Sequence, residues 1–593
     1  MSAGGALLGA IDRHMPTPIV VVARSGLHRP LRQVYRGVPR TQPATMYIGR
    51  IYTLALGTVM VASVAVLLAT VMGWIAPSVP MVVLSIAASV GLAGAVVFAG
   101  WSLPQLRAEM HRREVARTLP GAVDHLQVLA SGAESPRAMF TRLVDVDVHG
   151  GTGAEFRRVL TIATLSGRLD EGIMTVARLT AAQESLRPFL VNLRAHLAQG
   201  PEALRGFLAL EARLLRHQQA AHRRQTMGML ELIAELVMVL LVVPALVVVI
   251  VTMLGPIVPV SSQVVPTPVG GMPLGELIVY LAGGFVLAVG GVAGQMVATL
   301  RPQEHVTSVT RPEGAMATVA AAGSNPAAMS VVAAVPTMLV TAGLGVLDGR
   351  LGLGLVVGFT IWATTVGMVG WRQAREDDAK DEHLRELVHA VAGYVELGMP
   401  FGDAVERIAQ ETDLGPLRQD VAHLAFALRL RDRHPDHEGP TQEVALDRFA
   451  HRVGTPLAAR TVGVIASALA AGAHPRLIFE RLQTQVAELY RTKQSMRAEM
   501  QVYAAVGWTT ALLVVGISVA ATTQLFDQLS MVSAMGGQSI AGAGYRVMLT
   551  TVATAIAAGW FAGMAIRDRY AGLLHAGVLS MITVTVGWLV GML

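Results

Sequence analysis

The sequence predicts an all-α membrane protein that crosses the bilayer about nine times and carries two large helical inserts. Three observations lead to this fold class. Only 15% of the 593 residues are charged, whereas soluble proteins contain about 25%. Nine apolar runs, most of them about 20 residues long, are each sufficient to cross the hydrocarbon core. The two longest polar segments resemble each other, which indicates a direct internal duplication.

The N-terminal segment, 1–50, is expected to be a basic cytoplasmic tail. Its only acidic residue is Asp12, against seven arginines. It lacks the apolar core of about 7–15 residues that a secretory signal requires. An unstructured, solvated arm fits this composition, and so does an arm that contacts anionic lipid headgroups.

The predicted membrane spans fall into four groups, 51–103, 229–300, 330–371 and 502–593. Within these groups the apolar runs are 51–75, 81–103, 229–254, 274–300, 330–347, 351–371, 502–526, 547–566 and 571–593. The fifth run is short and contains Pro336, so it is the weakest of the nine.

The distribution of basic residues predicts the orientation of the chain, because cytoplasmic connections are enriched in lysine and arginine. If the N-terminus is cytoplasmic, the inside segments 1–50, 104–228, 301–329, 372–501 and 567–570 hold 45 of the 47 basic residues. The outside segments hold only Arg350 and Arg546. An odd number of spans then places the C-terminus outside the cell membrane.

The first insert, 104–228, has 17 basic and 12 acidic residues and a helical pattern. Its apolar residues recur every three or four positions, as in an amphipathic helix. These residues are Leu119, Val123, Leu126, Leu129, Leu204, Phe207, Leu208, Leu214 and Leu215. We therefore expect a bundle of helices, with the short segment 301–329 as a later cytoplasmic linker.

The second insert, 372–501, has 17 basic and 20 acidic residues and repeats the plan of the first. The segment Ala459–Phe526 corresponds to Arg187–Leu254 at an offset of 272 residues. The matched pairs are Leu197 with Leu469, Ala198 with Ala470, Gly200 with Gly472, Phe207 with Phe479, and Leu210 with Leu482. The opening hairpins of the two inserts correspond at an offset of 266, with Gly132 matching Gly398.

Four glycines are expected at hairpin turns, namely Gly132, Gly200, Gly398 and Gly472. Glycine readily adopts the left-handed conformation that ends a helix, and proline suits the first turn of the next one. Gly200 is followed directly by Pro201. We therefore expect helix ends at these turns.

The module of a short helix, a glycine-centred turn, an amphipathic helix, a basic collar and an apolar span resembles the type II secretion F domain. Two such copies in a chain of nine spans resemble the membrane platform proteins of archaeal type IV pili and archaella (the PilC, TadC and FlaJ group). The resemblance covers roughly 105–300 and 372–566. It implies a non-enzymatic platform on which a separate hexameric cytoplasmic ATPase acts to insert pilin-like subunits into a filament. It does not distinguish a pilus from an archaellum.

Motifs for catalysis are missing from the sequence. Both lysines, Lys380 and Lys493, lack the surroundings of a P-loop. There are no cysteines, no zinc-binding HExxH helix and no GxSxG nucleophile. His434, Asp436, His437 and Glu438 form a donor-rich group, but a solvated loop explains it better than a metal site. We therefore expect no enzyme activity, no cofactor, no metal and no nucleic-acid partner.

A charged collar precedes the third and seventh spans, and it is basic in the first copy and nearly neutral in the second. In the first copy it contains Arg213, Arg216, Arg223 and Arg224, and in the second copy Arg491 and Arg497. These residues are candidate contacts either for anionic membrane lipids, at about 1 kcal/mol per arginine, or for the ATPase. The first insert has a net charge of +5 and the second of −3. These opposite signs fit an attraction between the two inserts, and they equally fit two distinct faces presented to one partner.

Two acidic residues, Glu231 and Glu235, lie at the start of the third span, four residues apart. Charged residues in a membrane are costly and commonly functional. A partner such as Arg224, a contact with a pilin, and solvation at the interface all remain open. Glu276 and Gln295 on the fourth span are weaker cases.

Small-residue pairs occur at Gly290/Gly294, Gly354/Gly358 and Gly559/Gly563. Such pairs allow close helix packing, either within one chain or in a homodimer.

The main competing hypothesis is a polytopic membrane transporter. Transporters are also duplicated, but often with inverted halves and with polar or broken helices at the membrane midplane. Here both halves run in the same direction, and two inserts above 120 residues are large for a carrier. A membrane-bound hydrolase is a third possibility, but the sequence contains no recognisable hydrolytic site.

Overall fold

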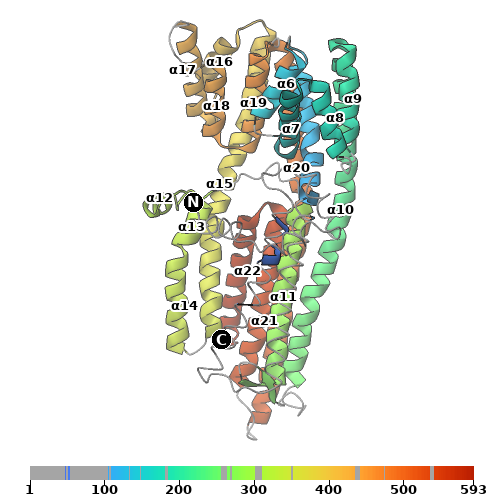
Figure 1. The fold of residues 1–593 in the computed structure, drawn as a ribbon. Helices are drawn as coiled ribbons and strands as arrows, with labels where there is room; N and C mark the ends of the chain where they lie inside the picture. Colours follow the sequence, from blue (N-terminus) through green and yellow to red (C-terminus); the bar gives the residue numbers. More distant parts are fainter. Residues whose placement is uncertain are drawn as a thin grey trace. The chain divides into compact units, whose positions relative to one another are not determined.

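The fold was derived from a computed structural model, shown in Figure 1. The structure describes residues 47–48, 51–53, 60, 105, 108–132, 134–146, 149–180, 185–254, 264–267, 270–300, 310–348, 351–433, 441–472, 475–533 and 540–592. The chain divides into two compact units. Unit 1 comprises Met1–Arg216 and Ser467–His474, and unit 2 comprises His217–Ala466 and Pro475–Leu593.

Unit 1 is a bundle of helices. Residues 108–129 form its first helix, and a turn at 130–132 follows. The next helices are α6 (Pro136–Asp145), α7 (Gly150–Ser166), α8 (Leu169–Leu179) and α9 (Leu186–Gln199). Helix α10 (Pro201–Leu254) starts in unit 1 and continues into unit 2. The side chain of Ser135 caps α6 by accepting a hydrogen bond from the amide of Ala138, as expected of an N-cap serine.

The core of unit 1 consists of apolar side chains from all of these helices. Leu119, Leu126 and Leu129 on the first helix are fully buried. Phe140 of α6 and Phe156 of α7 pack edge to face, with ring centroids 5.0 Å apart. The predicted apolar pattern of this insert is therefore correct at most positions. Leu214 is an exception, because it is 47% exposed while its neighbour Leu215 is buried.

The soluble part of unit 2 is also helical. It contains the end of α15 (Leu351–Glu396), α16 (Phe401–Glu411), the 3₁₀ turn η4 (Gly415–Leu417), α17 (Arg418–Arg433) and α18 (Gln442–Val453). Helix α19 (Pro456–Ala470) starts in unit 2 and ends in unit 1. Helix α20 (Pro475–Ser533) then leads to the apolar helices.

Seven helices within the described ranges are long and apolar enough to cross a membrane. They cover Met227–Thr252, Leu274–Thr299, Pro326–Leu344, Gly352–Glu396, Ile478–Gln524, Gly544–Ile566 and Arg569–Leu589. Seven of the nine predicted spans lie on these helices. Of the other two, 81–103 lies outside the described residues, and only residues 51–53 and 60 of 51–75 are described. The helices therefore indicate a multi-pass membrane protein.

Among its described residues, unit 2 contains six further helices. They are α11 (Leu274–Leu300), α12 (Ala315–Ala320), α13 (Pro326–Val332), α14 (Ala334–Asp348), α21 (Ile540–Ile566) and α22 (Arg569–Leu589). Pro336 lies in the first turn of α14, where a missing amide hydrogen costs no hydrogen bond.

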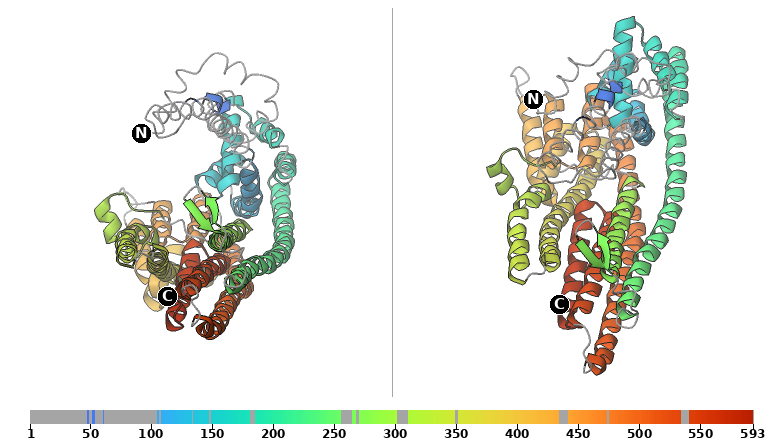
Figure 2. Two further views of the ribbon diagram at one scale, coloured as in Figure 1. Left: turned by 90° about the horizontal axis from the view of Figure 1, so that it is seen from below. Right: turned by 60° about the horizontal axis from the view of Figure 1, so that its bottom comes forward.

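The helical fold class is confirmed, and one short hairpin adds to it. The connection between α10 and α11 contains two short antiparallel strands, β1 (Val264–Thr267) and β2 (Gly270–Pro273), drawn as green arrows in Figure 2. Val264 pairs with Pro273, and Thr267 pairs with Gly270. This hairpin pairs backbone groups of the connection with one another.

Glycines bring the apolar helices of unit 2 close together. A side chain at Gly290 of α11 would lie 2.5 Å from the Cβ of Ala557 on α21, and Gly294 lies against Trp560. Gly559 and Gly563 of α21 lie equally close to Ala576 and Ala571 of α22. Gly358 of α15 meets Thr341 of α14. These predicted small-residue pairs therefore pack within one chain.

Candidate coupling interface

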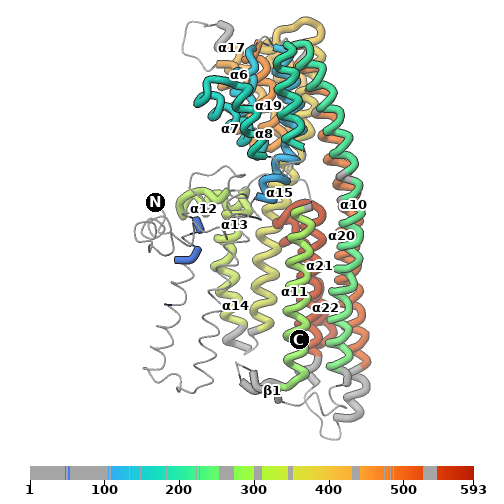
Figure 3. The backbone as a smooth tube through the Cα atoms, turned by 45° about the vertical axis from the view of Figure 1, so that its right-hand side comes forward, coloured from blue at the N-terminus to red at the C-terminus, as the bar shows by residue number. Residues whose placement is uncertain are grey.

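Three helices connect the soluble segments to the apolar spans without a break. Helix α10 has 54 residues, α15 has 46 and α20 has 59. In the tube of Figure 3, α10 and α20 are each drawn as one continuous helix. Each of these soluble segments is therefore joined to its span by helical backbone, with a rise near 1.5 Å per residue, and not by a loop.

A charged junction lies where α15 and α20 leave their apolar parts. The carboxylate of Asp378 lies 3.1 Å from the amine of Lys493 and 2.7 Å from the guanidinium of Arg567, and it also accepts a hydrogen bond from Arg497. Asp381, one turn away, lies 2.6 Å from Lys493. We call these five residues the charged junction. It joins α15, α20 and the connection between α21 and α22.

The junction is largely removed from water. The side chain of Asp381 is 6% exposed, that of Lys493 13% and that of Arg567 18%. Removing one partner from such a group leaves another charge buried without compensation, which costs far more than losing a surface pair. The junction therefore holds the three elements together only as long as its charges remain complementary.

Electrostatics favour the ionised form of Asp378, which lies beyond the apolar part of α15. Burial alone would raise the pKa of Asp378, but the nearby charges of Arg567, Lys493 and Arg497 together hold that pKa below its ordinary value. The folded protein is therefore more stable when Asp378 is ionised than when it is protonated. This stabilisation is present at neutral pH and is lost as the pH falls through the lowered pKa.

The predicted collar residues lie in different surroundings. Arg497 belongs to the charged junction, whereas Arg491 is exposed on the same helix. In the first copy, Arg213 and Arg224 are exposed, and neither has an ion-pair partner among the described residues. Arg216 is partly buried. The backbone of Arg223 is helical, and its side chain lies outside the described part of the chain.

Glu231 and Glu235 both lie on exposed positions of α10. Neither has an ion-pair partner within the described residues, so the structure does not bring Arg224 to them. Glu276 on α11 does have a partner, because its carboxylate lies 3.1 Å from the guanidinium of Arg546 on α21. Gln295 is exposed on the C-terminal half of α11.

The four hairpin glycines do not share one backbone conformation. Gly200, Gly398 and Gly472 have positive φ angles of 110°, 89° and 70°. Gly132 does not have the left-handed backbone that we expected. Glycine is required there for a different reason, because a Cβ at Gly132 would lie 2.7 Å from the carbonyl oxygen of Ala471.

That close approach is part of a joint within unit 1 between the first insert and the end of α19. Arg142 of α6 donates a hydrogen bond of 2.9 Å to the carbonyl of Ala470. The Nε2 of His125 and the hydroxyl of Ser467 are 2.6 Å apart, and both residues are buried. Ala471 completes the apolar core of unit 1. We call this contact the α19 joint.

Sequence reasoning missed most of these residues. Asp378, Asp381 and Arg567 looked like ordinary surface charges near a span. The signal that was available is the position of Arg567 in a connection of only four residues between two spans, where a charge has few routes to water. Arg142 and His125 carried no local signal, because their partners follow more than 300 residues later.

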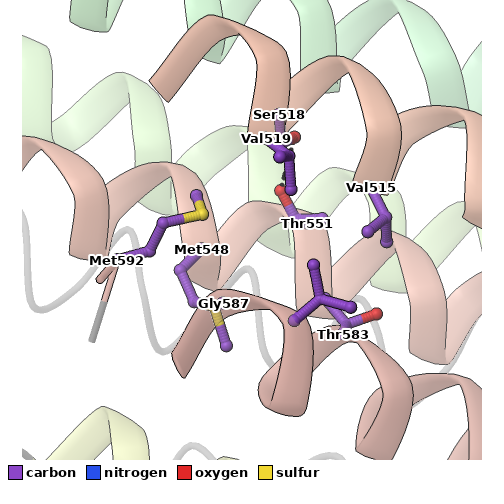
Figure 4. A pocket seen from close by; sticks show the side chains of 9 residues that line it. Val515, Ser518, Val519, Met548, Thr551, Thr583, Gly587 and Met592 are labelled. Carbon is purple, nitrogen blue, oxygen red and sulfur yellow. Dashed lines mark hydrogen bonds between the residues drawn. The ribbon is translucent and has the colours of Figure 1, made fainter. Parts of the chain in front are cut away.

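The described residues contain no group of three or more histidine, cysteine or acidic side chains arranged to hold a metal ion. The predicted donors His434, Asp436, His437 and Glu438 lie outside the described residues. Figure 4 shows a small space between α20, α21 and α22. Its polar groups are hydroxyls already bonded within the protein, such as Ser518 to Thr551 at 2.8 Å.

Comparisons with known proteins give no relative: no family model, curated protein or solved structure matches this chain.

Proposed function

We propose that this protein is a non-enzymatic membrane platform of a type IV pilus-like assembly machine. In this role it couples a separate cytoplasmic hexameric ATPase to the insertion of pilin-like subunits into a filament. The observation that carries the proposal is the unbroken course of α10 and α20 from a soluble bundle into an apolar span. A chain that lacks nucleotide-binding motifs but has such helices is suited to transmit force that a partner generates.

The charged junction gives this coupling a physical route in unit 2. A movement of the second insert pulls on α15 and α20 directly, because both helices pass through it. Through Asp378 and Arg567 the same movement reaches the connection between α21 and α22. Four apolar helices would then respond together to one push from outside the membrane.

We also propose that the chain arose by direct duplication. Helices α10 and α20 both begin at a proline, Pro201 and Pro475, shortly after a positive-φ glycine. When Pro201 is aligned with Pro475, the buried positions of the two helices coincide. Leu204, Leu208 and Ala212 are buried in α10, and Ile478, Leu482 and Val486 are buried at the corresponding positions of α20. The corresponding helices α11 and α21 also pack against each other, in parallel.

The proposed topology has nine spans, with the N-terminus in the cytoplasm and the C-terminus outside. Two ion pairs support it. Asp378 and Arg567 meet, and both belong to connections assigned to the inside. Glu276 and Arg546 meet near the starts of α11 and α21, and both starts are assigned to the outside. Opposite assignments within either pair would require a charge to cross the bilayer.

Capture of the ATPase tests the proposal. The tagged full chain, extracted from its own host's membranes in mild detergent, is expected to retain a hexameric ATPase at low salt. The double variant R213E/R224E should weaken that retention, because opposite charges at exposed sites attract and salt screens them. The matched control R137E/R178E changes the same charge on α6 and α8 and should leave retention unchanged.

Two results would count against parts of the proposal. If the wild-type chain retains no ATPase under any salt condition, the platform function is wrong. If the wild type retains it and R213E/R224E retains it equally well, the platform function stands and the collar binds only lipid.

A further inference from the structure

The α19 joint uses one hairpin from each insert, so duplication creates a second, corresponding pair of hairpins. In the joint, the end of α19 with Gly472 contacts the hairpin that contains Gly132. The counterparts are the end of α9 with Gly200 and the hairpin that contains Gly398. The inference below rests on the internal duplication proposed above and does not depend on the ATPase.

The key donor of the joint has a counterpart in the second insert. Helices α6 and α16 bury the same positions: Met139, Phe140 and Leu143 in α6 correspond to Ala404, Val405 and Ile408 in α16. The turn between Gly398 and Phe401 is one residue shorter than the turn between Gly132 and Pro136, which changes the offset from 266 to 265. In this register Arg142 corresponds to Arg407. Glu134 holds Arg142 at 2.6 Å, and Glu411 holds Arg407 at 3.0 Å. The guanidinium of Arg407 is therefore oriented by a carboxylate, as that of Arg142 is, and it is 53% exposed.

The acceptor also has a counterpart. Arg142 donates to the carbonyl of Ala470 at the last turn of α19. The residue corresponding to Ala470 is Ala198, in the last turn of α9. Carbonyl groups at a helix end lack partners inside the helix and attract cations. A side chain built at Gly200 or at Gly398 would meet no atom within 4 Å, so both hairpin tips are open in the chain by itself.

Both open hairpins expose large apolar side chains. Leu397, beside Gly398, is 84% exposed. On the other hairpin Leu210 is 61%, Leu214 47% and Val191 41% exposed. In the α19 joint, Ala471 is 4% exposed and belongs to a core, whereas the corresponding residue of the open hairpin, Gln199, is exposed. Burying these leucines against each other would be favourable at about 25 cal/mol per Å² of apolar surface.

The charges of the two hairpins are complementary. Residues 187–213 contain four arginines and two glutamates, which gives a net charge of +2. Residues 394–413 contain five acidic residues and one arginine, which gives −4. Opposite net charges favour encounter between these two surfaces and disfavour pairing of either surface with itself.

We propose that the α9–α10 hairpin of one copy of this chain binds the α15–α16 hairpin of a second copy, with Arg407 donating to the carbonyl end of α9. Two copies related by a twofold axis make this contact twice and close on themselves. The four inserts of such a dimer then alternate, joined within each chain by the α19 joint and between chains by its counterpart.

Cross-linking of engineered cysteines tests this arrangement. The chain contains no cysteine of its own, so only the engineered thiols can react. Two differently tagged full-length copies are expressed together, one with Q199C and the other with L397C, and their membranes are treated with a short bismaleimide. We expect a cross-linked product that carries both tags. The control pair, L165C with L397C, uses a residue that is 83% exposed on α7 and should give none.

The donor is tested in the same assay. Adding R407A to the L397C copy should lower the cross-linked fraction about tenfold, because a hydrogen bond from a charged donor is lost. R178A in the same copy should change nothing. A two-tag product that depends on Arg407 supports the proposal.

Other outcomes overturn it. If a single chain carrying both Q199C and L397C cross-links internally while the two separately tagged copies give no two-tag product, the counterpart joint closes inside the monomer and the proposal is wrong. Cross-linking of either single cysteine to the ATPase alone would assign this surface to that partner instead. Failure of ATPase capture with a normal two-tag product would leave this proposal intact while rejecting the proposed function.

Discussion

Asp378 and Arg567 form an ion pair of 2.7 Å although 189 positions separate them in the chain. One lies on α15, which leads into the second insert, and the other lies in the short connection between two apolar helices. Lys493 and Arg497 of α20 complete the group. A movement of the second insert therefore cannot displace one of these helices without straining its bonds to the others.

Replacing Asp378 with asparagine should destabilise unit 2. Lys493, Arg497 and Arg567 would keep their charges while their shared carboxylate is lost. We expect a cost of about 2 kcal/mol in the free energy of unfolding, visible as a lower Tm of the detergent-solubilised protein. The matched variant D447N, whose side chain is 69% exposed, should change stability by less than about 0.5 kcal/mol. Equal effects of the two variants would show that the junction is not a structural link.

The stabilising effect of Asp378 should depend on pH in one direction. Its pKa in the folded protein is lowered by the three cations, so protonation is easier in the unfolded chain, where an aspartate has a pKa of about 3.9. The difference in Tm between wild type and D378N should be constant from pH 7 to about pH 5. It should then shrink below about pH 4, as the carboxylate becomes protonated. A difference that grows on acidification would contradict the lowered pKa.

Gly132→Ala should destabilise unit 1, because the new Cβ would lie 2.7 Å from the carbonyl oxygen of Ala471. We expect a cost of about 1–3 kcal/mol from this overpacking, measured by hydrogen exchange of residues 108–129. The matched control is Gly206→Ala in α10, where no atom lies within 4 Å. That substitution should instead stabilise the helix by up to about 1 kcal/mol. Two variants of equal stability would exclude the close contact.

Gly290→Ala should weaken the packing of α11 on α21, since its Cβ would lie 2.5 Å from that of Ala557. Its neighbour in sequence, Gly291, meets no atom within 4 Å. We expect the Tm of G290A to fall and that of G291A to stay the same or rise, both measured in the same detergent. A lower Tm for G291A than for G290A would mean that the opposite face of α11 carries the contact.

The sequence predicted the helical fold because apolar periodicity and span length are local properties. The pattern from Leu119 to Leu129 identified one buried face correctly. The alignment of the two copies was less successful, since it paired Leu210 with Leu482, which are 61% and 2% exposed. The reason is that the loop after Gly472 is two residues longer than the one after Gly200, which shifts the register from 272 to 274.

The candidate interface was harder to predict, because its partners are distant in the chain. The four glycines were recognised as turn residues, but Gly132 is glycine because a carbonyl from the other insert lies against it. Arg497 was expected to meet a lipid or a partner protein, whereas it bonds to Asp378. Only three-dimensional proximity distinguishes a solvated arginine from one that holds two helices together.

The central claim is that both inserts lie on the cytoplasmic side of one membrane, where a single motor reaches them. The direct measurement is labelling of single cysteines in intact cells with a membrane-impermeant maleimide. L165C and L397C, on exposed sites of the first and second inserts, should be protected until the cells are lysed, whereas L589C near the C-terminus should be labelled at once. Labelling of only one of the two insert cysteines in intact cells would place the inserts on opposite sides and contradict the account.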